Sequence, residues 1–100
     1  MILWEYQVKP ERLAEFESIY AANGAWAELF QKGEGYLGAE LYRDPIQPGR
    51  FVTIDRWRSA EAYADFKTKW KTEYQTLDAR CNDLTEHETL IGTFLLVPSG

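Results

Sequence analysis

Two hydrophobic periodicities alternate along the chain, and their order constrains the fold more than any other feature. Apolar residues at every second position predict strands over residues 2–8, 36–43, 50–57 and about 85–97. Apolar residues at steps of three and four predict helices over residues 10–30 and 59–81. This order repeats a strand–helix–strand unit and predicts an α+β, ferredoxin-like βαββαβ fold. We therefore expect a four-stranded antiparallel sheet, with the first and third strands central and both helices on one face.

Residues 1–100 have the length of one domain, and we expect its ordered core to span about residues 2–97. Ser59 is a favourable N-cap for the second helix, whose apolar stripe then continues for five turns. Asn23-Gly24 interrupts the pattern of the first helix. This dipeptide predicts either a boundary between two short helices or a hinge at the mouth of a pocket.

The two central strands carry apolar side chains on both of their faces. On one face these are Trp4, Tyr6, Phe51 and Trp57, and on the other they are Leu3, Val52 and Ile54. Helices can cover only one face, and an antiparallel sheet that meets water on the other is normally polar there. We therefore expect two copies of the chain to pack these open faces together as a homodimer with twofold symmetry.

Charge and composition exclude several classes of partner. The net charge is −5, and nucleic acid is not expected because phosphate binding needs a concentrated basic face. No apolar run reaches the length of a membrane span and no signal peptide is recognisable, so we expect a cytoplasmic protein with no membrane partner. With a single cysteine, Cys81, and a single histidine, no metal constellation is expected, and we predict no cofactor.

Aromatic residues are abundant, and those of the helices recur on one face. In the second helix Tyr63, Trp70 and Tyr74 share this face, and in the first helix Trp26 and Phe30 do so. These five residues are candidate walls of a pocket for a small aromatic or apolar ligand. The alternative is that the same stripe forms an ordinary core, since an amphipathic helix must bury one face.

Asp55 and His87 are the polar candidates for catalysis. Asp55 lies in a central strand on the face of Trp57, where a carboxylate must be paired, hydrogen-bonded or directed into a pocket. A structural ion pair is the alternative for Asp55. His87 has the side-chain type that titrates near neutral pH and is a natural general base. Its alternative is an incidental place on the surface near a strand end.

With the elements placed, two segments resemble the antibiotic biosynthesis monooxygenase family of dimeric α/β-barrel proteins. Residues 51–66, FVTIDRWRSAEAYADF, resemble the family's strand that ends in Trp and is followed by Ser and a helix beginning Glu-Ala-Tyr/Phe. Residues 32–38, KGEGYLG, are similar to the family's Pro-Gly-Phe-x-Gly turn, with Glu34 in place of the proline. Element order and length agree over nearly the whole chain. The resemblance implies a dimeric α/β barrel.

The resemblance also implies candidate activities. Members include oxygenases that oxidise polycyclic phenols with no metal or flavin, and relatives that bind and degrade haem. The haem-degrading relatives use a late-helix His, an Asn near the first strand and a helical Trp. The matching positions here hold Thr76, Ile2 or Leu3, and Phe66, so haem degradation is not expected.

Three functions therefore stay open. The first is a cofactor-independent monooxygenase (an oxidoreductase) acting on a small aromatic or quinol-type substrate. The second is a non-catalytic dimeric module that binds a small ligand or assists another enzyme. The third is an isomerase or lyase on the same fold, with His87 or Asp55 as its base. Because a fold does not decide among them, we look for a pocket that holds a buried polar side chain, which favours an enzyme over a solidly packed module.

Overall fold

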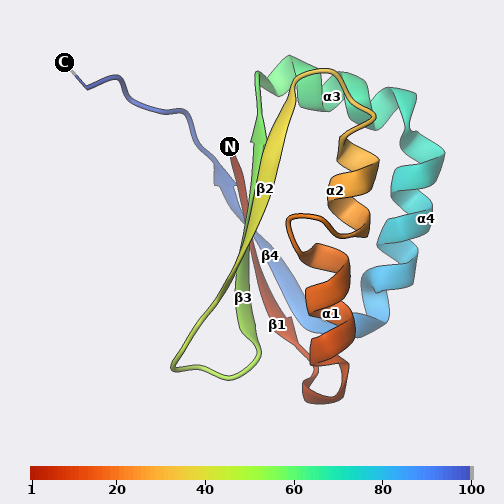
Figure 1. Ribbon diagram of the computed structural model, residues 1–100, viewed down its shortest axis with the longest axis vertical. Helices are drawn as coiled ribbons and strands as arrows, with labels where there is room; N and C mark the ends of the chain where they lie inside the picture. The colour runs from red at the N-terminus through yellow and green to blue at the C-terminus, as the bar shows by residue number, and fades with distance from the viewer. Residues whose placement is uncertain (100) are drawn as a thin grey trace.

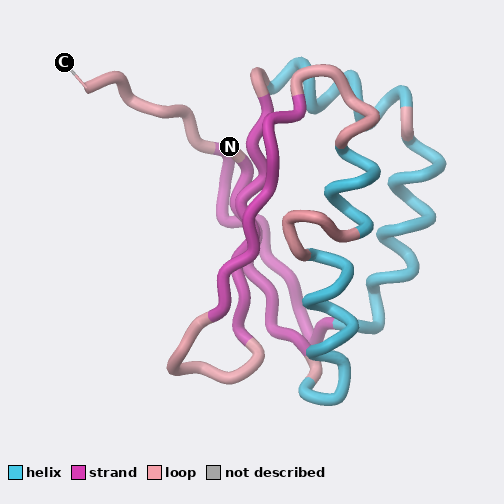
Figure 2. The backbone as a smooth tube through the Cα atoms, in the orientation of Figure 1, coloured by secondary structure: helices cyan, strands magenta, loops and turns pink. Residues whose placement is uncertain are grey.

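The computed structural model describes residues 1–99 and confirms the predicted fold class. Four antiparallel strands pair in the order β2-β3-β1-β4. Their bounds are β1 (Ile2–Val8), β2 (Tyr36–Arg43), β3 (Arg50–Trp57) and β4 (Thr85–Thr93). The helices are α1 (Leu13–Tyr20), α2 (Ala25–Phe30), α3 (Ala60–Lys69) and α4 (Lys71–Cys81), with short 3₁₀ turns η1 (Pro10–Arg12) and η2 (Asn82–Leu84). All four α-helices lie on one side of the sheet, and the other side carries no helix (Figures 1 and 2).

The alternation seen in the sequence sorts the central strands into two faces. Tyr6 of β1 lies opposite Phe51 of β3, and both are buried under the helices. Leu3 lies opposite Ile54 on the other face, where both are only partly covered. The sheet therefore has one aromatic face that forms the core and one open face with apolar residues among its charges.

The first helical segment divides at the predicted point. α1 ends at Tyr20 and α2 begins at Ala25, with Gly24 preceding α2 as its N-cap. A Cβ on Gly24 would lie 2.4 Å from the carbonyl oxygen of Ile19 and 2.5 Å from that of Ser18. Only glycine fits such a close approach of two backbone segments. Asn23-Gly24 is thus a boundary between two helices.

The second helical segment differs from the prediction of one continuous helix. Ser59 caps α3 as expected, accepting a hydrogen bond from the Ala62 amide at 3.1 Å. The helix is then broken at Trp70, whose φ and ψ of −110° and 32° leave the helical range, and α4 leaves in a new direction (Figure 1). The break allows Phe66 of α3 to pack on the sheet near one end while α4 runs alongside α2. The periodicity continues through the break because both helices bury one side.

The last strand is shorter than predicted, because β4 ends at Thr93 rather than near Val97. Its register with β1 shifts between Leu3 and Trp4, close to Gly92. Beyond Thr93 the chain extends away from the sheet (Figure 2). Leu95, Leu96 and Val97 are each more than four-fifths exposed there.

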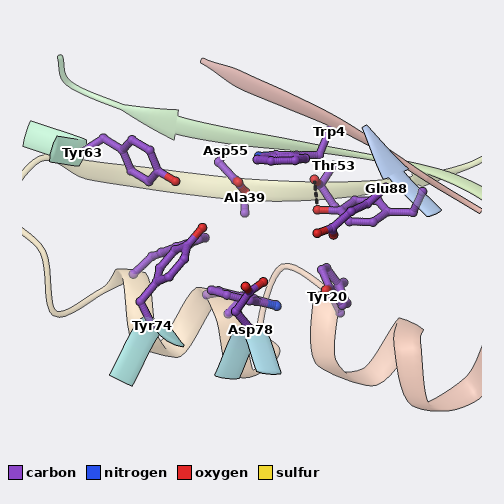
Figure 3. Close-up of a pocket in the computed structure, with 14 residues that line it drawn as sticks. Trp4, Tyr20, Ala39, Thr53, Asp55, Tyr63, Tyr74, Asp78 and Glu88 are labelled. Carbon is purple, nitrogen blue, oxygen red and sulfur yellow. Dashed lines mark hydrogen bonds between the residues drawn. The ribbon is translucent and has the colours of Figure 1, made fainter. Parts of the chain in front are cut away.

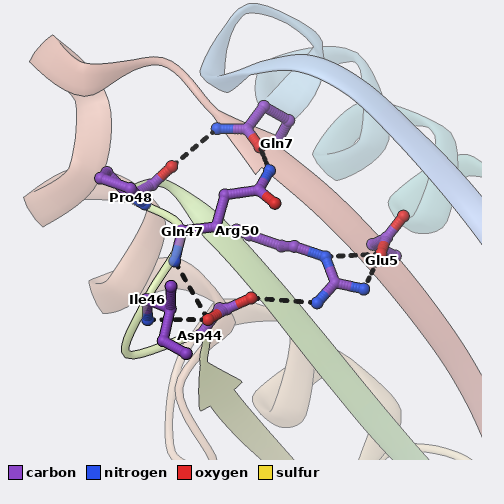
Figure 4. A network of polar contacts seen from close by, with 7 residues as sticks. All are labelled: Glu5, Gln7, Asp44, Ile46, Gln47, Pro48 and Arg50. Carbon is purple, nitrogen blue, oxygen red and sulfur yellow. Dashed lines mark hydrogen bonds and ion pairs between the residues drawn. The ribbon is translucent and has the colours of Figure 1, made fainter.

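The turn between β2 and β3 is held by a polar network on the open side (Figure 4). The Asp44 carboxylate accepts hydrogen bonds from the amides of Ile46 at 2.8 Å and Gln47 at 3.1 Å, which lower the pKa of Asp44. Arg50 bridges Asp44 and Glu5, joining the turn to β1. Because these charges are still partly exposed to solvent, they fix the register of the hairpin more than they stabilise the fold. Among residues 1–99 no helix combines the length and apolar character needed to cross a bilayer.

Candidate functional site

A partly open cavity of about 50 Å³ lies between the sheet and the helices (Figure 3). It sits beside the α1–α2 junction, since Ala21 and Ala27 belong to its wall. Its other lining residues are Trp4, Tyr6, Tyr20, Trp26, Phe30, Ala39, Thr53, Asp55, Tyr63, Tyr74, Asp78 and Glu88. The helix–sheet interface is therefore not packed solid, and the hollow carries both aromatic rings and carboxylates.

Asp55 is the side chain that sets the chemistry of this cavity. It lies on β3 between Ile2 of β1 and Ala39 of β2, neither of which offers a polar side chain. The expected alternative of an ion pair is wrong: within residues 1–99 no cation lies within salt-bridge distance of Asp55. Burial alone therefore acts on the carboxyl and raises the pKa of Asp55 to about 6.

The small side chain of Ala39 keeps the space next to Asp55 open. A bulky residue at this position of β2 would stand directly beside the carboxylate, because Ala39 and Asp55 are opposite one another in the ladder. The carboxylate consequently faces the cavity, as Figure 3 shows. A group with a pKa near 6 that faces a cavity can accept a proton at neutral pH and hold it through a reaction step.

Two phenols stand near Asp55 on the helix side. Tyr63 of α3 packs against Trp57 with ring centroids 5.4 Å apart, and Tyr74 of α4 packs edge-on against Trp26 at 5.1 Å. Their hydroxyl groups point into the same space as the Asp55 carboxylate (Figure 3). Burial raises the pKa of Tyr63 and of Tyr74 above that of a free phenol. Both therefore remain protonated at neutral pH and can donate hydrogen bonds to a ligand.

A third phenol has its own partner in the sheet. Tyr6 of β1 and Thr53 of β3 form a buried hydroxyl pair at 3.3 Å. Burial raises the pKa of Tyr6, so this phenol too stays protonated. Tyr6 and Thr53 line the cavity on the sheet side, and they extend its polar surface away from Asp55 along the same face.

Five of the seven candidate residues from the sequence come together here: Trp26, Phe30, Asp55, Tyr63 and Tyr74. Trp70 does not line this cavity. It lies at the break between α3 and α4 and lines a separate hollow with Lys32, whose Nζ is 5.0 Å from the ring centroid. His87 also lies elsewhere. It pairs with Gln7, and both side chains lie on the open face of the sheet, whereas Tyr6 lies on the face covered by the helices. The structure therefore does not bring His87 together with Asp55.

Asp78 and Glu88 line the cavity, although the sequence analysis did not single them out. Asp78 comes one helical turn after Tyr74, so the spacing alone could have placed it on the same face. Glu88 follows His87, and the alternation of the strand directs it to the helix side. Glu88 is exposed as a whole residue, but the partial burial of its carboxyl group and, after it, the charge of Asp78 raise the pKa of Glu88. Neither residue belongs to a cluster of three metal-binding side chains, since residues 1–99 contain none.

Comparison with known proteins now gives the family. Residues 1–78 match the description Antibiotic biosynthesis monooxygenase. The chain belongs to the antibiotic biosynthesis monooxygenase family. All the cavity residues except Glu88 lie within the part that matches the family. No curated protein matches the sequence.

Several proteins of known structure share the fold of this chain, although their sequence identity to it is low. SnoaB of Streptomyces nogalater, a cofactor-independent oxygenase, is 21% identical with a TM-score of 0.66, over 98% of this chain and 95% of SnoaB. PA3566 of Pseudomonas aeruginosa is 14% identical with a TM-score of 0.68, over 96% and 92% of the two chains. A proposed antibiotic biosynthesis monooxygenase of Nitrosomonas europaea is 15% identical with a TM-score of 0.66, over 94% and 97%.

The unpaired state of Asp55 predicts a pH-dependent effect on stability. The pKa of Asp55 is about 6 when folded against an ordinary value of 3.8, so the folded state binds the proton more tightly. The stabilisation from this proton is complete below pH 3.8 and is lost as the pH rises through 6. Asp55→Asn should therefore raise the free energy of unfolding by about 1–2 kcal/mol at neutral pH. Near pH 3.8 the variant and the wild-type protein should have nearly the same free energy of unfolding.

Urea unfolding of both proteins at the two pH values measures this difference. Asp83→Asn is the matched control, because Asp83 is exposed and lies outside the cavity. That control should change stability by only a few tenths of a kcal/mol at either pH. If Asp55→Asn instead lowers the free energy of unfolding equally at both pH values, the Asp55 carboxylate has hydrogen-bond partners in the folded protein.

Proposed function

We propose that this protein is a cofactor-independent monooxygenase that oxidises a small aromatic, quinol-type substrate in the cavity around Asp55. The observation that carries the proposal is the cavity-facing carboxylate of Asp55, which has no ion-pair partner within residues 1–99 and whose pKa burial raises to about 6. A carboxylate held unpaired in a central strand costs stability, and such groups concentrate at functional sites. Membership of the monooxygenase family supports the same reading.

Asp55 would act as the general base. A substrate such as an anthrone carries two hydrogens on a carbon between aromatic rings, and Asp55 removes one as a proton. The electron pair left on the substrate reduces O₂ and forms a C–O bond, and the resulting peroxide takes the proton back from Asp55. Loss of the second hydrogen as a proton, with cleavage of the O–O bond, gives a carbonyl and water. One oxygen atom enters the product, and the substrate supplies all four electrons.

Tyr63 and Tyr74 would stabilise the charge that builds on the substrate. Both phenols stay protonated because burial raises their pKa, and their hydroxyl groups point toward the region of Asp55 (Figure 3). Donors that are already in place before charge develops lower a barrier without reorganising. The surrounding rings of Trp4, Trp26 and Phe30 would keep water from the reactive intermediate.

The size of the cavity bears on the substrate. The free space of the cavity is about 50 Å³. A substrate of several fused rings would enter only if lining side chains moved outward. Asp78 and Glu88 are exposed, so their side chains can move at low cost. Substrates no larger than an anthrone should react more readily than larger polycyclic ones.

Oxygen uptake with a panel of anthrones and hydroquinones, corrected for spontaneous oxidation, tests the proposal. With a substrate that turns over, kcat/KM should rise with pH to a plateau, with a midpoint near the pKa of Asp55, about 6. Asp55→Asn should lower kcat by about 10²- to 10⁴-fold, the usual contribution of a general base. Asp83→Asn should leave kcat unchanged. Unaltered turnover by Asp55→Asn would remove Asp55 from the mechanism.

The proposed enzyme works as a homodimer joined through the open faces of two sheets. Leu3, Val52 and Ile54 lie partly exposed on this face, and half of the Tyr42 side chain surface is exposed beside them. An apolar surface of this kind on a sheet is normally covered. The exposed apolar segment from Phe94 to Val97 extends from the same sheet and would gain cover from a second copy.

Light scattering at micromolar concentration should give a mass of twice 11.6 kDa. Ile54→Glu places a charge in the centre of the open face and should shift the protein to a monomer. Ile46→Glu is the matched control, because Ile46 lies in the β2–β3 turn with 89% of its surface exposed, and it should remain a dimer. A monomeric wild-type protein would contradict the assembly and leave the cavity proposal standing.

A further inference from the structure

The charged groups of the cavity are all acidic. Asp55 reaches it from β3, and two exposed residues, Asp78 of α4 and Glu88 of β4, also line it, whereas no lysine, arginine or histidine does. None of these three carboxylates forms an ion pair with any residue in the range 1–99. A hollow of this kind repels an anionic ligand and attracts a cationic one.

Asp78 and Glu88 act on the same part of the hollow. Glu88 comes from the sheet and Asp78 from the helix layer, and both point into the gap between them (Figure 3). The two are close enough for the charge of Asp78 to raise the pKa of Glu88. They do not form a metal site, because no set of three metal-binding side chains occurs in the described range. An organic ammonium group, by contrast, can bind between two carboxylates without a third ligand.

The aromatic walls suit the same kind of group. An ammonium ion binds favourably over the face of a Tyr or Trp ring. Two of the lining rings already make such a cation–π contact. Lys67 Nζ lies 5.4 Å from the Tyr63 ring centroid and 4.9 Å from that of Tyr74. Lys67 is not one of the cavity-lining residues. The rings of Trp4, Tyr20 and Trp26 line the hollow as further aromatic walls.

The proposed reaction would gain from a positive charge near the substrate, in addition to the hydrogen bonds of Tyr63 and Tyr74. When Asp55 takes a proton from the substrate, the negative charge moves onto the substrate, and Asp78 and Glu88 oppose it. No lining side chain offers a positive charge to compensate. A protonated amine on the substrate itself, held between Asp78 and Glu88, would supply the compensation at the moment the charge develops.

We propose that the cavity takes small aromatic substrates that carry a protonated amine, with the ammonium group between Asp78 and Glu88 and the ring beside Asp55. The proposal rests on the proposed function of the cavity as the substrate site. Aromatic carboxylates of the same size would be excluded by the three acidic side chains, and neutral phenols would bind with intermediate affinity.

Three probes with one ring test the proposal by calorimetric titration at neutral pH and low ionic strength. They are 4-hydroxyphenethylamine, 4-hydroxyphenylethanol and 4-hydroxyphenylacetate, which share the 4-hydroxyphenyl ring and carry a cationic, a neutral and an anionic side chain of similar length. The amine should bind about tenfold more tightly than the neutral alcohol. The acetate should bind more weakly than both. Raising the salt concentration should reduce the preference for the amine.

The double variant Asp78→Asn/Glu88→Gln should reduce the preference for the amine to about twofold or less. Glu73→Gln/Asp83→Asn is the control, because it changes the net charge equally at residues that do not line the cavity, and it should keep the full preference. If the neutral phenol binds and the amine binds no better, the inference fails and the proposed function stands. If no probe binds, both the inference and the proposed function fail. A preference that the double variant keeps would also overturn the inference.

Discussion

A layer of aromatic side chains between the helices and the sheet is the interaction on which this structure depends. Phe16 of α1 stacks on Tyr20 with ring centroids 4.1 Å apart and packs against Tyr6 of β1 at 5.3 Å. At the other end, Phe66 of α3 packs against Trp57 of β3 at 5.2 Å. Rings of this size bury much apolar area while keeping the two layers apart. The aromatic rings of α2 link these two ends, and the cavity lies beside them.

The position of Asp55 follows from this arrangement. Its neighbours in the ladder, Ile2 and Ala39, supply neither a charge nor a hydrogen bond from a side chain, so the carboxylate depends on the cavity for its solvation. A folded protein retains such a destabilising group where the group has a function. The same reasoning applies to Asp78 and Glu88, which line the cavity with no basic residue beside them in its wall.

The sequence predicted the sheet because its alternation reports burial directly, and three of the four strands begin and end at the predicted residues. Periodicity could not reveal the break at Trp70, since both α3 and α4 bury the same stripe on either side of it. The cavity was predicted in part. Trp26, Tyr63 and Tyr74 were found because aromatic spacing marks a shared face, whereas Glu88 depends on a strand register that only the paired sheet fixes.

The cavity keeps the carboxylate of Asp55 unpaired and poorly solvated. Carboxyl-detected NMR on protein labelled with ¹³C at aspartate measures this directly, with Asp55→Asn used to assign the resonance. The Asp55 resonance should titrate with a midpoint near pH 6. A midpoint at or below the ordinary aspartate value of 3.8 would show instead that the carboxylate is paired or well hydrated.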